Sequence, residues 1–295
     1  MVRPDEFAID DATLARLLHA QAPGWTELPL RRLASSGTDN AIYRLGEHLC
    51  VRVPRRPSAE GLLAKEMDWL PRLGGLPLEV PHLRFRGRGD GVSVPDFAVL
   101  DWMEGGIASP GAIADWPEAA RQLAAFLGAL QRQDTRAAPR AGESNHRRGV
   151  ALRDLSPVTR DCIDLLADEI DAAPARQLWE DACIAAFRGP PVWLHGDLKA
   201  DNLIARDGTL CGVIDWGLAA IGDPAVDLAA AWSWVAPSAR EDFRDALDVD
   251  DVVWQRARGW ALYGAVIALS YYRGGRNEAL CRQSRQTLAR LGLLL

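Results

Sequence analysis

Residues 195–202 read His-Gly-Asp-Leu-Lys-Ala-Asp-Asn, and residues 213–217 read Val-Ile-Asp-Trp-Gly. Between these stretches, an Asp207-Gly208 pair separates two short apolar runs, a pattern that predicts a β-hairpin. Folding the chain about this turn brings Asn202 and Asp215 to the same face of the hairpin. Diagonal neighbours of this kind lie about 7–8 Å apart at the backbone, so their side chains can share one cation.

The residue types in these stretches suit a hard divalent cation. Magnesium prefers oxygen ligands and takes only one or two of them from protein, which fits the carboxylate of Asp215 and the carboxamide of Asn202. Asp197 lies five residues before Asn202, on the approach to the same site. A carboxylate held there can accept a proton from a substrate hydroxyl. We therefore predict Asn202 and Asp215 as metal ligands and Asp197 as the catalytic residue.

This block resembles the catalytic loop of kinases, in which Asp is followed five residues later by Asn and then by Asp-x-Gly. The form His-Gly-Asp, together with Gly222-Asp223-Pro224 and Asp227, is similar to the aminoglycoside phosphotransferase family. That family of small-molecule kinases includes macrolide kinases. The resemblance extends from about Ser35 to the C-terminal helices.

The resemblance implies an α+β protein with a bilobal protein-kinase-like fold. A small N-terminal antiparallel sheet lobe with a helix would precede a larger, mostly helical C-terminal lobe. We expect residues 1–100 to form the N-lobe, which binds the nucleotide phosphates, and residues 101–106 to form a hinge linker. Residues 107–295 would form the helical C-lobe, with the catalytic loop and the substrate pocket.

The resemblance also implies a function, with Mg²⁺ and ATP (or GTP) as cofactors. The expected reaction transfers the γ-phosphoryl group to a hydroxyl of a small molecule, first of all an aminoglycoside-type antibiotic. The alternatives are a macrolide kinase, a metabolite or sugar kinase, and a catalytically inert nucleotide-binding module. A protein kinase is disfavoured by Gly196 and by the lack of an Ala-Pro-Glu motif after Gly217.

The same resemblance predicts where the nucleotide phosphates bind. Ser36 and Gly37 belong to a turn-rich loop similar to the phosphate-covering loop of kinases, although a plain hairpin turn is the alternative. Arg52 stands where kinases carry a lysine. Arginine stays charged and grips phosphate through two N–H groups, so we interpret Arg52 as a nucleotide clamp. The alternatives for Arg52 are a solvated strand arginine and an error in the assumed strand register.

Further residues are expected around the nucleotide. Glu66 is the predicted partner of Arg52, with Glu60 as the rival in the first turn of the same helix. The backbone of Asp101, Trp102 and Met103 would contact the adenine edge, while the Trp102 side chain only packs in the alternative interpretation. Members of the family often carry another residue at the position of Lys199. Protein kinases have a lysine at the equivalent position, which approaches the transferred phosphate, and Lys199 is expected to do the same. The alternative is a solvated loop lysine.

Neighbouring residues are expected to support the catalytic loop. His195 ends a buried strand, and its ring would fix the loop backbone instead of acting as a base. Asp227 is expected to cap a helix that starts at Leu228 and to hold the loop through backbone hydrogen bonds. Asp223 either faces the substrate or caps a turn. Elsewhere, helices are predicted to begin at four places: after Asp10 or Asp11, after Ser58, after Asp115 and at Ser156-Pro157.

Composition limits the class of protein. The chain has 295 residues, of which 48% are hydrophobic and 25% charged, as in ordinary globular proteins. No apolar run reaches the roughly 18–20 residues that span a bilayer, and no leader pattern opens the chain. Five scattered cysteines predict reduced thiols in a cytoplasmic protein. A net charge of −6 argues against a nucleic-acid partner and mildly favours cationic substrates. We expect no membrane partner, and a monomer or weak homodimer.

The acceptor pocket is the part that the sequence leaves open. Carboxylates between Asp154 and Asp181, or between Glu241 and Asp251, would suit the ammonium groups of an aminoglycoside, although any solvated helix face looks the same. A broader apolar pocket for a macrolide would be lined by the following side chains: Trp232, Trp234 and Tyr271.

Overall fold

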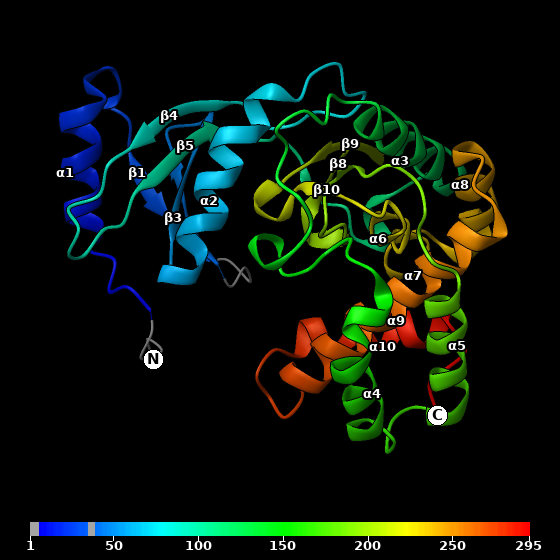
Figure 1. Ribbon diagram of the computed structural model, residues 1–295. Coiled ribbons are helices and arrows are strands. Elements are labelled where there is room, and N and C mark those ends of the chain that lie inside the picture. The colour runs from blue at the N-terminus through cyan, green and yellow to red at the C-terminus, as the bar shows by residue number, and fades with distance from the viewer. Residues whose placement is uncertain (1–5, 35–38) are drawn as a thin grey trace. The chain divides into compact units, whose positions relative to one another are not determined.

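The computed structural model describes residues 6–34 and 39–295 (Figure 1). The chain divides into two compact units. The sheet unit comprises residues 1–74, 79–104 and 212–218, and the helical unit comprises residues 75–78, 105–211 and 219–295.

The sheet unit is built on a five-stranded antiparallel sheet with the strand order β1-β2-β3-β5-β4. Arg52 lies on the central strand, where it is opposite Ile42 of β2 and Ala98 of β5. The strands are β1 Leu30–Arg32, β2 Asn40–Leu45, β3 Leu49–Pro54, β4 Leu83–Gly87 and β5 Phe97–Asp101.

Two helices accompany this sheet: α1 (Asp11–Gln21) and α2 (Pro57–Trp69). Asp10 caps α1, since its carboxylate accepts a hydrogen bond from the backbone N–H of Thr13 at 2.9 Å. The predicted cap at Ser58 is wrong, because α2 already begins at Pro57. Proline suits the first helical position, where its fixed φ fits the helix and its missing N–H costs nothing.

The two faces of β3 have different roles because successive side chains of a strand point to opposite faces. Val51 and Val53 lie in the apolar core of the sheet unit together with Leu14 and Leu18 of α1. Arg52, between the two valines, points to the other face. The core therefore fixes the strand that carries the arginine.

The helical unit holds two short sheets. Strand β7 (Val192–Leu194) pairs with β10 (Ala220–Gly222) in antiparallel fashion. The second sheet has the strand order β6-β8-β9. Its strands are β6 Gly106–Ile107, β8 Leu203–Arg206 and β9 Thr209–Val213, of which residues 212–213 are counted with the sheet unit.

The predicted hairpin at Asp207-Gly208 is confirmed. The two residues connect β8 to β9 and have φ values of +52° and +81°. Positive φ at both central residues is the mark of a type I′ turn, which Asp-Gly favours.

Eight α-helices are described in the helical unit, and α9 lies at its centre. Its side chains Trp260, Leu262 and Val266 are almost fully buried. Asp115 caps α3 by accepting from the Glu118 N–H at 3.0 Å, and α4 begins at Ser156, as predicted. The helices are α3 Trp116–Gln131, α4 Ser156–Leu165, α5 Ala172–Ile184, α6 Ala225–Leu228, α7 Ala230–Ser233, α8 Arg240–Leu247, α9 Asp251–Tyr272 and α10 Glu278–Arg290.

These elements confirm the predicted α+β class, with a small antiparallel sheet and a helix followed by a mostly helical remainder. All five cysteines are free thiols. Within residues 6–34 and 39–295, no helix combines the length and the apolar character needed to cross a membrane.

The type I′ turn gives a test of the fold. We predict that Gly208→Ala lowers the free energy of unfolding by about 1–2 kcal/mol, because a non-glycine residue is strained at positive φ. The added Cβ would also lie 2.9 Å from the Cβ of Ala114. Gly111→Ala is the control, since no atom lies within 4 Å of a Cβ there. Urea unfolding of both variants measures the difference, and equal stability would contradict the turn.

Candidate active site

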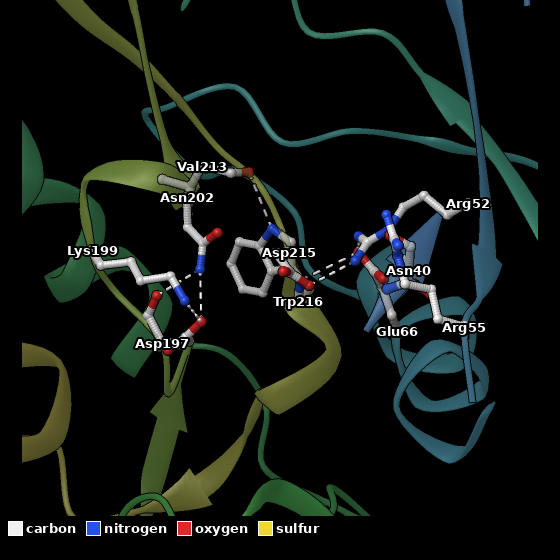
Figure 2. A network of polar contacts seen from close by, with 10 residues as sticks. All are labelled: Asn40, Arg52, Arg55, Glu66, Asp197, Lys199, Asn202, Val213, Asp215 and Trp216. Atoms are coloured by element: carbon white, nitrogen blue, oxygen red, sulfur yellow. Dashed lines mark hydrogen bonds and ion pairs between the residues drawn. The ribbon is translucent and has the colours of Figure 1, made fainter. Parts of the chain in front are cut away.

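Arg52 of the sheet unit lies between two carboxylates (Figure 2). Its Nη1 donates to Oε1 of Glu66 at 2.6 Å, and its Nη2 donates to Oδ1 of Asp215 at 2.6 Å. Arg52 is on β3, Glu66 is on α2, and Asp215 follows β9 in a left-handed conformation with φ of +69°. The forked guanidinium thus joins three segments of the chain.

Because Arg52 and Glu66 are buried, the charge of each depends on the presence of the other. Arg52 is only 8% exposed and Glu66 only 1%. Burial alone would lower the pKa of Arg52, but the charges of Glu66 and Asp215 outweigh burial and raise that pKa. Burial also raises the pKa of Glu66, which is opposed by Arg52 and by a hydrogen bond from the Trp216 backbone N–H at 3.2 Å. A buried ion that lost its partner would be strongly destabilising.

The predicted contact between Glu66 and Arg52 is therefore present, whereas the rival Glu60 is exposed in the first turn of α2. The alternative of a solvated strand arginine is wrong, because the strand alternation turns Arg52 to the face covered by α2. The role of Arg52 as a nucleotide clamp stays a prediction.

The sheet unit also holds polar atoms that its own chain does not satisfy. Among the described residues, buried Nε of Arg52, Oε2 of Glu66 and Oδ1 of Asn40 have no hydrogen-bond partner. Such atoms are rare in proteins and each requires an explanation. An unused N–H of a buried cation fits an anionic ligand such as a phosphate oxygen.

The predicted catalytic loop of the helical unit forms a second polar cluster, also drawn in Figure 2. Oδ2 of Asp197 accepts hydrogen bonds from Nζ of Lys199 at 2.8 Å and from Nδ2 of Asn202 at 2.9 Å. Neither contact uses Oδ1 of Asp197. Asn202 donates from the same nitrogen to the backbone oxygen of Asp197 at 2.8 Å, so its carboxamide oxygen remains the atom suited to a cation.

A buried carboxylate holds this loop from behind. Asp227 is 2% exposed and accepts hydrogen bonds from the backbone N–H groups of His195 at 2.7 Å and Gly196 at 2.8 Å. The fully buried ring of His195 accepts at Nδ1 from the Asp197 N–H at 3.2 Å. The structural roles predicted for His195 and Asp227 are confirmed. The prediction that Asp227 caps a helix starting at Leu228 is wrong, because α6 begins at Ala225 and already contains Asp227.

Asp223 has the turn-capping role. Its Oδ1 accepts from the Ala225 N–H at 3.1 Å, and the residue is 2% exposed. Its ionic partner is Arg256 of α9, a residue that the sequence reasoning missed. Its position in the sequence could have indicated its burial, because Arg256 lies four residues before Trp260, on the buried face of the helix.

Two backbone N–H groups of the predicted hinge already donate hydrogen bonds within the sheet unit. The N–H of Asp101 donates to His82 O at 3.0 Å, and the N–H of Trp102 donates to His48 O at 2.8 Å. The N–H groups of Asp101 and Trp102 are therefore already used. Of the backbone groups predicted to contact the nucleobase, the carbonyl groups of residues 101–103 and the N–H of Met103 remain.

The hinge side chains interact within the sheet unit. The guanidinium of Arg44 lies over the Trp102 ring, 4.0 Å from its centroid, so the Trp102 side chain packs. The Asp101 carboxylate accepts two hydrogen bonds from Arg84, at 2.6 and 2.9 Å. Ser36 and Gly37, the predicted phosphate-loop residues, lie outside the described residues.

The predicted site residues thus gather in two groups. Arg52 binds Glu66 and Asp215 in the sheet unit, and Asp197 binds Lys199 and Asn202 in the helical unit. Among residues 6–34 and 39–295, no group of three or more His, Cys, Asp or Glu side chains could hold a metal. A carboxylate plus a carboxamide oxygen nevertheless fits magnesium, which takes few protein ligands. Shared binding by Asn202 and Asp215 stays a prediction.

The acceptor pockets suggested by the sequence are not supported at those residues. Several carboxylates of the two acidic runs form ion pairs with arginines on helix surfaces: Asp164 with Arg176, Glu180 with Arg160, Asp242 with Arg121 and Asp251 with Arg244. Trp232 and Trp234 are 3% and 2% exposed and pack against Trp254 and Trp116, so they belong to the core. Tyr271 is 51% exposed.

Comparison with known proteins identifies the family. The model of the phosphotransferase enzyme family matches residues 31–260. The chain belongs to this family. An aminoglycoside 3'-phosphotransferase of Escherichia coli is 39% identical over 67 residues, 22% of this chain and 25% of the relative. The chain thus spans about a quarter of the aminoglycoside 3'-phosphotransferases that it matches. Viomycin phosphotransferase of Streptomyces vinaceus is 28% identical over 200 residues, 63% of this chain and 67% of the relative.

Solved structures of similar fold cover nearly the whole chain. The GDP complex of an aminoglycoside 2'-phosphotransferase-IIIa has a TM-score of 0.74 at 18% identity, and covers 96% of this chain and 99% of that one. A macrolide 2'-phosphotransferase from Brachybacterium faecium has a TM-score of 0.63 at 22% identity, with 93% and 98% covered. These likenesses confirm the predicted kinase-like fold of this family member.

The buried ion pair gives a test that needs no substrate. We predict that Glu66→Gln lowers the free energy of unfolding by about 3 kcal/mol or more, because it leaves the buried Arg52 charge without its buried partner. Glu60→Gln, on the exposed face of the same helix, should change stability by less than about 0.5 kcal/mol. Urea unfolding measures both. Similar effects of the two variants would show that the pair does not hold the sheet unit together.

Proposed function

We propose that this family member transfers the γ-phosphoryl group of ATP or GTP to a hydroxyl of a small molecule. The observation that carries the proposal is the held carboxylate of Asp197. Its Oδ2 is fixed by Lys199 and Asn202, both from the same loop, and the loop itself is fixed by Asp227. A carboxylate positioned in this way suits the alignment and deprotonation of an attacking hydroxyl.

The proposed roles follow from the chemistry of phosphoryl transfer, where positioning and charge neutralisation provide most of the rate. The acceptor oxygen forms a bond to the γ-phosphorus while the bond to the β-phosphate oxygen breaks, and the nucleoside diphosphate leaves. Asp197 takes the hydroxyl proton. Arg52 orients the α- and β-phosphates, and Lys199 approaches the transferred group. Asn202 and Asp215 contribute oxygen ligands to magnesium, whose charge offsets that of the phosphates.

An aminoglycoside-type antibiotic is the acceptor class that we propose first. The support comes from the names of relatives and from the net charge of −6, which mildly favours cationic substrates. Viomycin is a second candidate, because the viomycin phosphotransferase matches a far longer part of this chain, 63% of it. A macrolide is less supported as the acceptor, because Trp232 and Trp234, which were expected to line its pocket, are packed in the core.

Release of nucleoside diphosphate in the presence of single acceptors tests this proposal. The acceptors are kanamycin, gentamicin, streptomycin, hygromycin B, viomycin and a macrolide, each with ATP and with GTP, and with no acceptor as the baseline. We expect one acceptor class to raise release well above the baseline and to yield a phosphorylated product by mass spectrometry. Nucleotide binding without product from any of them would favour the inert module.

The assignment of Asp197 predicts that Asp197→Asn lowers kcat by at least about a thousandfold, since the amide cannot accept the proton. The Kd for magnesium–nucleotide should stay within about threefold, because the binding residues are unchanged. Asp201→Asn is the matched control on the same loop, where the side chain contacts Gln283. Turnover by Asp197→Asn equal to that of Asp201→Asn would remove Asp197 from the catalytic role.

The assignment of Asp215 predicts a metal-specific effect. Asp215→Asn should weaken nucleotide binding at least about tenfold in the presence of magnesium and much less in EDTA, because a carboxylate ligand is lost. Calorimetric titration with a non-hydrolysable nucleotide under both conditions measures this difference. A loss of the same size with and without magnesium would assign Asp215 to the support of Arg52 alone.

A further inference from the structure

A second buried ion pair lies in the helical unit, close in sequence to the Asp227 that holds the catalytic loop. Nε of Arg256 donates to Oδ2 of Asp223 at 2.8 Å, and Nη2 donates to Oδ1 at 3.3 Å. The two bonds form a bidentate fork. The residues are 5% and 2% exposed, so solvent does not screen the pair.

The rest of the Arg256 side chain is enclosed by the helical unit. Nη1 donates to the backbone oxygen of Ala185 at 3.2 Å and to that of Val252 at 3.4 Å. The guanidinium also lies 5.4 Å from the centroid of the Phe187 ring. These neighbours are neutral, so Asp223 is the carboxylate that compensates the buried charge among the described residues. Loss of either member would leave the other as an uncompensated buried ion.

Asp223 occupies the junction between two elements that lead to the catalytic loop. Its backbone N–H donates to the oxygen of Gly149 at 2.9 Å, directly after β10. Its carboxylate accepts a hydrogen bond from the N–H of Ala225, the first residue of α6. Strand β10 pairs with β7, which ends one residue before His195. Helix α6 carries Asp227, which binds the N–H groups of His195 and Gly196. Asp223, which Arg256 binds, is therefore connected to the catalytic loop both through β10 and through α6.

We propose that Arg256 is a positioning residue for the catalytic loop, acting through Asp223 and Asp227 on the backbone of His195 and Gly196. It contacts neither substrate nor nucleotide in this assignment. The kinetic part of the assignment rests on the proposed phosphotransfer, whereas the effect on the loop backbone does not.

Amide hydrogen exchange of the segment around His195 and Gly196 tests the proposal without any substrate. In Arg256→Met we expect exchange at these two amides to rise by more than about tenfold, because their acceptor Asp227 is no longer held in place. Exchange in α3, to which neither Asp223 nor Arg256 is hydrogen-bonded, should stay within about twofold, which distinguishes a local effect from global destabilisation. Exchange of the His195 and Gly196 amides at the wild-type rate in Arg256→Met would overturn the proposal.

Two further variants complete the experiment. Arg273→Met is the matched control: Arg273 caps the end of the same helix α9 and pairs with Asp168 at 3.0 Å on the surface. It should leave exchange at the loop unchanged. The double variant Asp223→Asn with Arg256→Met removes both charges and leaves no uncompensated buried ion, so we expect it to fold even where the single variant does not. It should show the same raised exchange, no greater than that of Arg256→Met, because both residues act through one contact. Wild-type exchange in the double variant would contradict the proposal.

Kinetics supply the second readout. With an acceptor that the wild type phosphorylates, Arg256→Met should lower kcat by at least about tenfold while the KM for nucleotide stays within about threefold. A larger effect on KM than on kcat would overturn the positioning role. Raised exchange at the loop in a protein that phosphorylates none of the acceptors would instead support the role of Arg256 and count against the proposed function.

Discussion

The positive charge of Arg52 is the constraint on which the sheet unit depends. Strand alternation turns this residue away from the apolar core, and α2 covers it, so the charge is almost removed from water. Two carboxylates make such burial tolerable, and they come from distant parts of the chain: Glu66 on α2 and Asp215 after β9. The forked guanidinium matters here, because each of its two terminal nitrogens binds one carboxylate. A lysine, with a single nitrogen, would not reproduce this geometry.

The helical unit solves a different problem, which is to hold a short irregular loop in one conformation. Buried carboxylates perform this task. Asp227 accepts two backbone N–H groups of the loop, and Asp223 joins the preceding strand to the helix that carries Asp227. Burial raises the pKa of both carboxyl groups, and Arg256 opposes that rise at Asp223. The residues proposed to touch the substrate therefore depend on residues that do not.

Local patterns allowed much of this arrangement to be predicted from sequence. The Asp207-Gly208 turn, the capping residues Asp10 and Asp115, and the order of the motifs each depend on a few neighbouring residues. Glu66 could be preferred to Glu60 only from the order of residues in the chain, because no local pattern marks the partner of Arg52. Arg256 could not be assigned, because its partner Asp223 lies 33 residues away and depends on tertiary packing. The error at Ser58 arose because Pro57 is the first helical residue, so the N-cap lies two residues earlier, at Arg56.

The central claim is that oxygen atoms of Asn202 and Asp215 bind the same magnesium ion in the nucleotide complex. A crystal structure with magnesium and a non-hydrolysable ATP or GTP analogue measures this directly. The account predicts both oxygens at about 2.1 Å from one ion, with Arg52 in contact with the α- or β-phosphate. An ion held by neither residue, with the nucleotide phosphates away from Arg52, would contradict it.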